Sequence, residues 1–244
     1  MRANYKLQRL FLDQPMGQGH ALDLDKAQSN YLMNVLRMAA GDTVLVFNGR
    51  DGEWRATLQP VSKKTAQLHV DTLERAQSAA PDLHYCFAPL KVGRLDYMVQ
   101  KAVEMGAGVL QPVLTQHTQN HRLNVDKMQA NALEAAEQCG ILALPSCREP
   151  LKFDAFLDGW DASRTLIFCD EDAATDNPLA TLTPLKGKPI GLLIGPEGGF
   201  SDEERAQLRE LDHVVAIPLG PRILRADTAA VAAMALVQAA CGDW

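Results

Sequence analysis

Hydrophobic and polar residues follow two different patterns along the chain, and the pattern changes close to residue 72. In the first part, the apolar run Thr43–Phe47 leads into a turn-forming cluster, and apolar and polar side chains then alternate over residues 54–58. Alternation with a period of two is typical of a half-buried β-strand. We therefore predict a small β-rich domain over residues 1–72, with one short helix at Asp25–Met38 ahead of the strands.

The remainder of the chain, residues 73–244, alternates short apolar runs with amphipathic segments. The segment 73–82 is small, polar and contains proline, so we place the domain boundary there. The predicted strands are His84–Ala88, Val109–Leu114, Thr165–Cys169, Ile190–Ile194 and Val214–Ile217, and the predicted helices are Asp96–Met105, Val125–Cys139, Asp202–Leu211 and Thr228–Ala240. Strand-helix alternation of this kind predicts an α/β domain with a mainly parallel sheet.

Two late strands end in similar Gly-Pro turns. Ile190–Ile194 runs into the loop Gly195–Gly199, and Val214–Ile217 runs through Pro218 and Leu219 into Gly220-Pro221. Ligands of open α/β sheets bind at the carboxyl ends of the strands, and glycine lets the backbone approach a ligand closely. The two loops therefore predict a ligand cradle. A pair of tight strand-to-helix turns without a ligand is the alternative that spacing alone leaves open.

The helix after the first loop argues against a phosphate ligand. Ser201 and Glu204 have the spacing of a capping box, so the helix begins there, and Asp202 and Glu203 complete an acidic first turn. These carboxylates already satisfy the helix dipole and would repel a phosphate. No Gly-Lys-Ser/Thr and no Gly-x-Gly-x-x-Gly pattern occurs, which excludes a P-loop and the dinucleotide fingerprint. The acidic rim favours a neutral or cationic ligand.

The second loop continues into two arginines and an alanine-rich helix. Arg222 and Arg225 flank an apolar pair, and Asp227 or Thr228 is a natural N-cap for the helix. The arginines are suited to holding an RNA phosphate or to stabilising negative charge that develops on a base. A solvent-facing pair bonded to the acidic rim is the alternative.

Charge is distributed unevenly between the two parts of the chain. The net charge is −6 overall, with nine Lys and Arg against seven Asp and Glu in residues 1–72, and fifteen against twenty-three in residues 73–244. Arg2, Lys6 and Arg9 lie within the first ten residues, which contain no acid. This asymmetry is compatible with an RNA-contacting first domain on an acidic body.

Cysteine and histidine usage favours a reduced protein without a metal. Five cysteines are scattered without a Cys-x-x-Cys pair, which is typical of reduced thiols in the cytosol. His117 and His121 lie four residues apart, but Pro112 and the polar residues around them indicate a loop, and no further ligand completes a set. We also find neither an apolar run of membrane-spanning length nor the apolar core of a signal peptide. We therefore expect a cytoplasmic protein with no metal site and no membrane partner.

The two late motifs carry a resemblance to a known family. Leu193–Ser201 (LIGPEGGFS) and Leu219–Arg225 (LGPRILR) resemble the small-subunit ribosomal RNA uridine-N3 methyltransferases, which belong to the SPOUT class. Supporting stretches occur in the family's order at Asn30–Arg37, Gly41-Asp42, Gln100–Gly106 and Glu134–Cys139. The chain departs from the family at three places: Ala226-Asp227-Thr228 replaces a usual Thr-Glu-Thr, and His117 and Ile141 stand where arginine is common.

The resemblance implies the fold and the cofactor. Residues 1–72 would form a PUA-like β-barrel that binds RNA, and residues 73–244 a knotted α/β domain, with a trefoil knot, that forms a homodimer. S-adenosyl-L-methionine would lie bent between the two late loops, with a third loop after Cys169. The residues that would bind it are Ile194, Gly195, Pro196, Glu197, Gly198, Gly199, Ile217, Leu219, Gly220, Ile223, Leu224 and Thr228.

The implied reaction is methylation of a uridine at N3 in 16S rRNA, within the small ribosomal subunit. N3 must lose its proton, and the remaining charge spreads over two carbonyl oxygens, so Arg222, followed by Arg225, is the expected stabilising group. Glu197 and Asp227 are the candidate bases. N3 lies on the Watson–Crick edge, so the base must be unpaired or flipped out. The expected RNA contacts are Arg2, Lys6, Arg9, Arg37, Lys63 and Lys64.

Two rival functions share these features. The chain could be a SPOUT methyltransferase that acts on another RNA, at a tRNA base or a ribose. It could also be an RNA-binding factor for ribosome assembly that does not methylate, which would keep the basic first domain and tolerate damage to the glycine loops. Cofactor binding and the identity of the methylated nucleoside separate the three.

Overall fold

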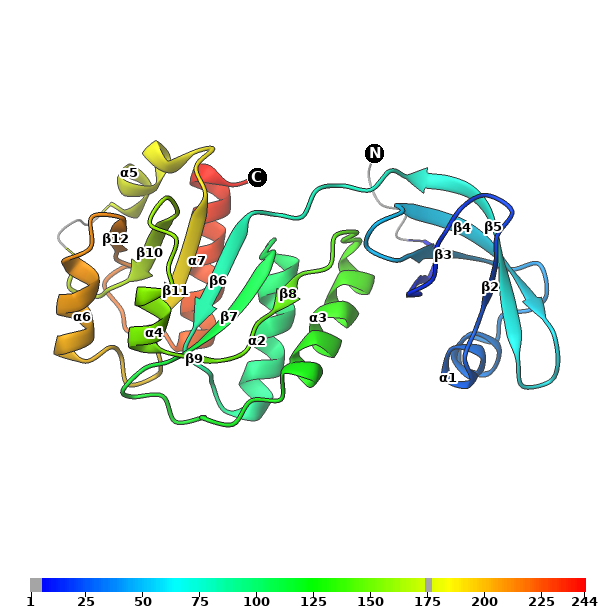
Figure 1. Cartoon of the computed structure of the whole chain (residues 1–244), viewed down its shortest axis with the longest axis horizontal. Coiled ribbons are helices and arrows are strands. Elements are labelled where there is room, and N and C mark those ends of the chain that lie inside the picture. The colour runs from blue at the N-terminus through cyan, green and yellow to red at the C-terminus, as the bar shows by residue number, and fades with distance from the viewer. Residues whose placement is uncertain (1–5, 174–176) are drawn as a thin grey trace. The chain divides into compact units, whose positions relative to one another are not determined.

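The computed structural model describes residues 6–173 and 177–244, which form two compact units (Figure 1). The first unit comprises the chain up to Ala79 together with Ala136–Leu144, and the second comprises Ala80–Ala135 and Pro145–Trp244. Of the sequence-based expectations, the RNA contact at Arg2 lies outside the described residues. No helix of the described part is long and apolar enough to cross a membrane.

The first unit is built on a five-stranded sheet. Its strands are β1 (Arg9–Phe11), β2 (Ala21–Asp23), β3 (Thr43–Phe47), β4 (Glu53–Pro60) and β5 (Ala66–Arg75), in the spatial order β1-β3-β4-β5-β2. β1 pairs with β3 in parallel, and the other pairs are antiparallel. One face of the sheet is a closed apolar core, in which Val44, Leu58 and Leu68 have no exposed surface. The predicted β-rich first part is therefore confirmed.

The predicted helix of the first unit changes its winding along its length. Asp25 is the N-cap and forms a capping box with Gln28, which starts α1 (Lys26–Asn30). The chain then continues as a π-helical segment, Tyr31–Val35, in which the amide of Leu36 donates to the carbonyl of Tyr31. Single π-helical turns are rare and occur often at functional sites.

The second unit contains a mainly parallel sheet with the spatial order β12-β10-β11-β6-β7-β8. Its strands are β6 (Leu83–Phe87), β7 (Val109–Leu114), β8 (Ser146–Cys147), β9 (Leu151–Lys152), β10 (Thr165–Cys169), β11 (Ile190–Ile194) and β12 (Val214–Ile217). Within the described residues, the pairings between these strands are all parallel, including that of β9 with β7. The order places β10 between β11 and β12, so the ends of these three strands lie side by side (Figure 1).

Helices pack on both faces of this sheet. They are α2 (Val92–Glu104), α3 (Val125–Cys139), α4 (Phe153–Asp158), α5 (Pro178–Leu182), a 3₁₀ turn (Thr183–Leu185), α6 (Asp202–Arg209) and α7 (Ala226–Cys241). Phe153 and Phe156 of α4 and Leu208 of α6 pack into an apolar cluster on one face. Elsewhere in the sheet, the side chain of Tyr85 in β6 is fully buried, and its hydroxyl contacts Met98 of α2.

In the second unit, the first residues of α2 and α7 differ from prediction. α2 begins at Val92, one turn before the expected Asp96. α7 begins at Ala226 with Arg225 at the N-cap position and no side-chain cap, so the prediction that Asp227 or Thr228 is the N-cap was wrong. The capping box of Ser201 and Glu204 is confirmed, since each side chain accepts a hydrogen bond from the backbone amide of the other residue.

Candidate active site

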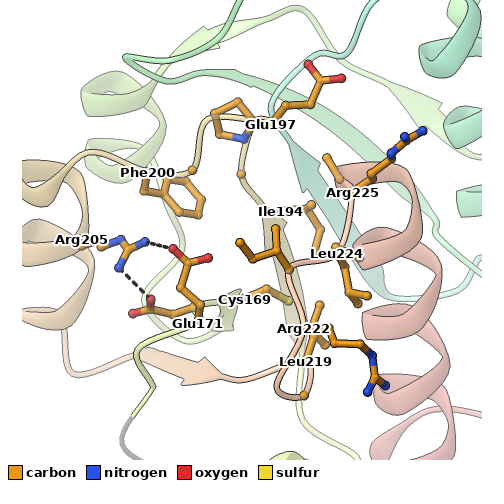
Figure 2. A pocket seen from close by; sticks show the side chains of 18 of the residues that line it. Cys169, Glu171, Ile194, Glu197, Phe200, Arg205, Leu219, Arg222, Leu224 and Arg225 are labelled. Atoms are coloured by element: carbon orange, nitrogen blue, oxygen red, sulfur yellow. Dashed lines mark hydrogen bonds and ion pairs between the residues drawn. The ribbon is translucent and has the colours of Figure 1, made fainter.

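A cavity of about 380 Å³ opens at the carboxyl ends of β10, β11 and β12 (Figure 2). Three loops line it: residues 169–171 after β10, residues 194–200 after β11, and residues 219–226 after β12. Parallel strands that are neighbours in a sheet present their carboxyl ends at one edge, and the strand order explains why the loops meet. The two Gly-Pro loops that the sequence singles out therefore line a single cavity.

Most of the residues expected to bind a cofactor lie on the wall of this cavity. The wall includes Ile194, Gly195, Pro196, Glu197, Gly199, Leu219, Gly220, Ile223 and Leu224. Gly198, Ile217 and Thr228 are not part of it. Ile217 is fully buried within β12, and Gly198 lies against His117, whose Cβ would be 3.2 Å from a Cβ added at the glycine. The sequence therefore located the loops, but which of their residues line the cavity depends on the three-dimensional path of each loop.

Glycine is required at two points of the wall for different reasons. A Cβ at Gly195 would lie 2.9 Å from the ring of Phe200, which is closer than ordinary contacts allow. Gly220 has a φ of +91°, in the left-handed region that residues with a Cβ rarely adopt. The first glycine makes room for the Phe200 ring on the cavity wall, and the second lets the chain turn after β12.

The loop after β12 presents unpaired backbone groups to the cavity. Among the described residues, the backbone amides of Leu219, Gly220 and residues 222–224 donate no hydrogen bond to the protein, and Pro221 between them has no N–H. Apolar side chains, including Ile194 and Leu224, line the same space. A flat ligand with polar edges, such as a purine base, matches free amides beside an apolar slot.

Charged side chains hold the loop after β10 in place. The carboxylate of Asp170 is 1% exposed and accepts from Arg209 of α6 at 2.6 Å, with Arg205 at 3.3 Å. Arg205 also binds Glu171 at 2.7 Å, and both residues line the cavity (Figure 2). This network joins the strand end to α6 and places both a carboxylate, Glu171, and its partner guanidinium, Arg205, on the wall.

The Cys169 thiol on the same wall is chemically quiet. Burial raises its pKa far above the ordinary value for a thiol, and the neighbouring Asp170 carboxylate acts in the same direction. A thiol of raised pKa stays protonated, and the thiol form is not the nucleophile. Cys169 therefore contributes shape and no covalent step.

Arg222 and Arg225 are exposed and unpaired at the mouth of the cavity. In the part of the chain that the structure describes, neither guanidinium has an ion pair or a hydrogen bond, so the acidic rim does not engage them. The side chain of Ile223 between them is 97% exposed. Two free cations and a bare apolar side chain beside the cavity form a surface on which a second, anionic reactant fits.

The two candidate bases have different surroundings. Glu197 lines the cavity, and its Oε1 accepts from Nη1 of Arg94 in the first turn of α2, at 2.7 Å. Asp227 does not line the cavity; its Oδ1 accepts from the backbone amide of Thr228 at 2.9 Å. Of the two candidate bases, Glu197 is favoured because it lies on the cavity wall.

The sequence missed several wall residues. Phe200, Arg205 and Ala229 line the cavity although the sequence did not assign them to the site. Phe200 directly follows the paired glycines, so an apolar residue bounded by a glycine loop and a helix start was the available signal. Arg205 lies one turn beyond an acidic helix start, and only the fold shows that it turns back to the loop after β10.

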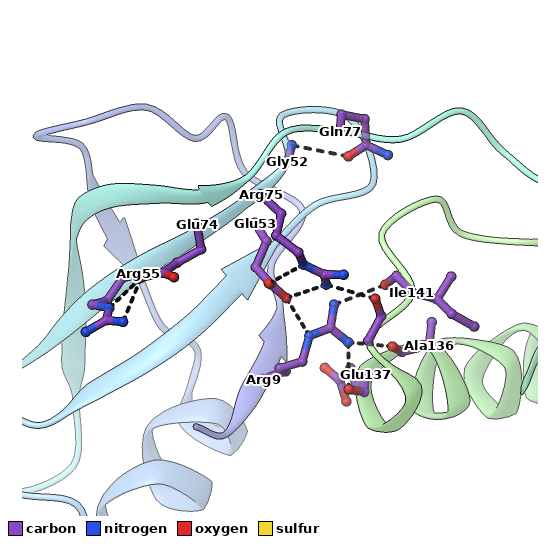
Figure 3. Close-up of polar contacts among 11 residues, drawn as sticks. Arg9, Gly52, Glu53, Arg55, Glu74, Arg75, Gln77, Ala136, Glu137 and Ile141 are labelled. Atoms are coloured by element: carbon purple, nitrogen blue, oxygen red, sulfur yellow. Dashed lines mark hydrogen bonds and ion pairs between the residues drawn. The ribbon is translucent and has the colours of Figure 1, made fainter. Parts of the chain in front are cut away.

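The predicted RNA contacts are divided between buried and exposed side chains. Lys6, Arg37, Lys63 and Lys64 are exposed. Arg9 is 5% exposed, and its guanidinium binds Glu53 at 2.6 Å (Figure 3). Because a buried and saturated guanidinium cannot reach a phosphate, the predicted RNA contact at Arg9 was wrong.

Arg9 belongs to a buried network within the first unit. It donates to the carbonyls of Ala136 and Glu137 at 2.6 and 2.7 Å, and to that of Ile141 at 3.1 Å. The carboxylate of Glu53, 1% exposed, accepts from Arg75 as well, at 2.7 and 2.9 Å. Two arginines therefore share one carboxylate and fix the segment Ala136–Leu144 to the β-sheet of this unit (Figure 3).

Comparison with known proteins places the chain in a family. Residues 77–238 match the model of an RNA methyltransferase domain, and residues 24–71 match that of an RNA methyltransferase PUA domain. The chain belongs to the RNA methyltransferase family. The predicted fold class, an α/β domain with a mainly parallel sheet and an N-terminal PUA-like domain, is confirmed.

Three relatives of this RNA methyltransferase are informative. Ribosomal RNA small subunit methyltransferase E from Synechocystis is 32% identical, over 88% of this chain and 72% of its own length. A methyltransferase from Legionella pneumophila, solved with the bound cofactor SAM, is 29% identical with a TM-score of 0.85, covering 98% of this chain and 99% of that one. The methyltransferase E of Neisseria gonorrhoeae, bound to S-adenosyl methionine, is 25% identical with a TM-score of 0.81 over the same shares.

Proposed function

We propose that this chain transfers a methyl group from S-adenosyl-L-methionine to N3 of a uridine in 16S rRNA. The observation that carries the proposal is the cavity at the ends of β10, β11 and β12, with two unpaired arginines at its mouth. Family membership supplies the reaction class, and the methyltransferase E relatives supply the small-subunit rRNA as substrate. The methyl group moves by direct displacement, so positioning is the protein's main task.

The cavity fits the cofactor in size and in chemistry. Its volume of about 380 Å³ lies within the roughly 300–1,000 Å³ that is typical of small-molecule sites. The free amides from Leu219 to Leu224 can bind the edge of the adenine, with Ile194 and Leu224 against its faces. Glu171 places a carboxylate on the wall, favourable for the sulfonium cation that carries the methyl group.

The chain's own residues must manage the proton and the charge of the base. In the transfer, the bond from sulfur to the methyl carbon breaks, the bond from that carbon to N3 forms, and the N3 proton leaves. Arg222, which has no partner within the described residues, stabilises the negative charge that spreads over the two uracil carbonyl oxygens. Arg225 contributes from the start of α7.

Glu197 is the proposed acceptor of the N3 proton. It lines the cavity, whereas Asp227 does not, and Arg94 holds its carboxylate in one orientation at 2.7 Å. General-base catalysis requires a positioned acceptor within hydrogen-bond reach of the proton. Asp227 is assigned to the first turn of α7, where its charge complements the helix dipole.

The partners and the place of action follow from the substrate. N3 lies on the pairing edge, so the uridine must be unpaired or flipped towards the cavity, with Ile223 as an apolar surface beside it. We propose that the protein acts on the assembled small subunit in the cytoplasm, as a homodimer with a mass of about twice 26.7 kDa. We further propose that residues 1–72 form the RNA-binding domain and residues 73–244 the catalytic domain.

The nucleosides of 16S rRNA test the substrate directly. Mass spectrometry of rRNA from a strain that lacks this protein should show the loss of N3-methyluridine, and its return on complementation with the wild type but not with Arg222→Ala. If N3-methyluridine persists while a tRNA or ribose modification disappears, the substrate assignment is wrong. If calorimetry shows no binding at millimolar S-adenosyl-L-methionine, the protein is not a methyltransferase.

A further inference from the structure

A second, smaller pocket lies in the same unit as the cavity described above. It has a volume of about 100 Å³ and lies between α2, α3 and residues 120–124 of the loop that leads from β7 into α3 (Figure 1). Its apolar walls come from Leu95, Val99, Leu123 and Met128. A bound water needs only roughly 10–15 Å³, whereas sites for whole cofactors occupy roughly 300–1,000 Å³. The pocket can therefore hold a group of the size of one nucleobase.

Three asparagine side chains on the wall of this pocket use only one of the two polar atoms of their amide. Asn120 donates to the carbonyl of Leu90 at 2.8 Å, and Asn131 donates to Asp96 at 2.9 Å. Asn124 accepts from a backbone amide at the start of α3, at 2.8 Å. Within the described residues, the second polar atom of each amide has no hydrogen bond. Two amide oxygens and one amide NH₂ group therefore remain for a ligand.

The charged side chains on the wall leave one positive charge uncompensated. The carboxylate of Asp96 accepts from Nζ of Lys127 at 2.7 Å, so these two charges cancel. Arg122 is exposed, and in the part of the chain that the structure describes its guanidinium has neither an ion pair nor a hydrogen bond. Apolar walls suit the faces of a base, free amides suit its edge, and a free guanidinium suits a phosphate. A nucleotide combines these three features.

The segment 88–96 lies between the pocket and the cavity and contacts both. The amide of Ala88 donates to the carbonyl of Ile194 on the cavity wall at 2.9 Å. Arg94 binds Glu197 of the same wall, and the next two residues of α2 line the pocket. The loop that forms the pocket follows β7, which is two strands from β11, or roughly 10 Å across the sheet. Both sites therefore lie at the carboxyl ends of neighbouring parallel strands.

We propose that this pocket between α2, α3 and residues 120–124, called the flanking pocket below, binds a nucleotide close to the target uridine in the RNA strand. The base enters between the two helices, and the phosphate contacts Arg122. This inference rests on the proposed function, because that function places the target uridine in the neighbouring cavity. A second nucleotide held a short distance away fixes the register of the strand, so the flanking pocket contributes to the choice of the uridine.

Arg122→Gln tests the phosphate contact. The substrate is the small ribosomal subunit from a strain that lacks this protein. Loss of one contact to a single-stranded RNA phosphate should lower the affinity for subunits about 3- to 10-fold near 0.1 M salt, and reduce the slope of log affinity against log salt by about 0.7. The single-turnover rate at saturating protein should stay within about 2-fold of the wild type, because the contact is equally strong in the ground state and the transition state.

Arg148→Gln is the matched control. Arg148 is also exposed, and its guanidinium has no ion pair or hydrogen bond within the described residues. Its backbone amide donates to the carbonyl of Leu110 near the start of β7, at 2.9 Å, so it lies at the opposite end of this strand from the flanking pocket. Arg148→Gln removes the same charge and should bind subunits within about 2-fold of the wild type.

The base is tested by changing the nucleotides around the target uridine one at a time, in subunits that carry plasmid-encoded 16S rRNA. At one position the change should lower the affinity of the wild type about 5-fold or more. Asn124→Ser keeps a residue type that caps a helix and removes the free amide group. In this variant the melting temperature should be unchanged, and the preference for that base should shrink to about 2-fold.

Four outcomes would overturn the inference. Arg122→Gln and Arg148→Gln weaken binding equally, which is an effect of net charge alone, or no flanking nucleotide changes the affinity. Arg122→Gln sediments with half the mass of the wild type, which makes the pocket an interface between two copies of the chain. Uridine or adenosine monophosphate binds the wild type but not Arg122→Gln in calorimetry, while both proteins bind subunits alike, which makes the pocket a site for a free nucleotide.

The same experiments separate this inference from the proposed function. A wild-type protein that binds subunits but transfers no methyl group from S-adenosyl-L-methionine would refute the proposed function. The comparison of subunit affinities uses no cofactor, so it would still decide whether the flanking pocket binds RNA.

Discussion

Arg9 and Arg222 are the same residue type in opposite surroundings. Arg9 of the first unit is 5% exposed and bonded to a carboxylate and three carbonyls, whereas Arg222 of the second unit is exposed with no partner among the described residues. A guanidinium that is buried and has its hydrogen bonds satisfied by the protein holds the fold together, whereas one that is exposed and unpaired is available to a substrate. Charge in the sequence therefore identifies neither role until burial and partners are known.

Arg9→Ala gives the largest expected effect, on stability. Removing this member of a buried ion pair leaves Glu53 with Arg75 as its one remaining partner and three carbonyls without their donor, which destabilises by about 3–5 kcal/mol. Urea unfolding followed by circular dichroism measures the change. Arg50→Ala, which removes an exposed partner of Asp13, should change stability by about 1 kcal/mol or less. If Arg9→Ala is as stable as the wild type but binds RNA more weakly, Arg9 is an RNA contact after all.

Arg222→Ala should act on turnover and leave the fold intact. Losing a group that stabilises charge in the transition state lowers the rate about 10²- to 10³-fold. Single-turnover methylation of 16S rRNA measures it, and calorimetry should show cofactor affinity within about 3-fold of the wild type, because binding by loop amides does not use this side chain. Loss of cofactor binding would instead make Arg222 a structural residue of the loop.

Glu197→Gln should slow turnover about 10²-fold and flatten the rise of the rate with pH, since the amide accepts no proton. Asp227→Asn, the matched change outside the cavity, should stay within about 3-fold of the wild type. The pH–rate profile distinguishes a base from a loop anchor. Arg94→Met provides a further control: it frees the Glu197 carboxylate without removing it, so it should disturb the rate less than Glu197→Gln does.

The smallest expected effect is a pH dependence of stability. Burial raises the pKa of Glu53, but hydrogen bonds from Arg75 and Arg9 outweigh it, so the pKa lies below its usual value of 4.5. A lowered folded-state pKa gives stability that is present above 4.5 and lost as the pH falls through the folded-state value. Urea unfolding from pH 6 to 3 should show this loss in the wild type, and a shallower one in Glu53→Gln. Identical slopes would contradict the ionised state of Glu53.

Local patterns predicted the elements that local chemistry controls. The capping box of Ser201 and Glu204 and the two Gly-Pro loops were visible in the sequence, because hydrogen bonds and turns within a few residues determine them. The predicted start of α7 was wrong because Arg225 occupies the N-cap position without a side-chain hydrogen bond. Asp227 and Thr228, residue types that favour the N-cap, lie inside the helix instead.

Distant contacts account for what the sequence did not reveal. β1 has three residues and exists through its parallel pairing with β3, which periodicity in so short a run cannot show. Likewise, the burial of Arg9 depends on carbonyls more than 120 positions away in the chain. Arg205 likewise lies on the cavity wall beside Asp170, a residue far from it in the sequence with which it forms an ion pair.

The segment Ala136–Leu144 bears on how the protein is made. The first unit consists of the chain up to Ala79 and of this later segment, whose carbonyls accept from Arg9 and Arg75. As the chain is synthesised, the unit lacks these acceptors until residues 136–141 have emerged from the ribosome, long after Ala79. The β-domain that comes first in the sequence is therefore completed only when much of the second unit has been synthesised. A fragment that ends at Ala79 would lack the segment that covers Arg9, Arg75 and Glu53.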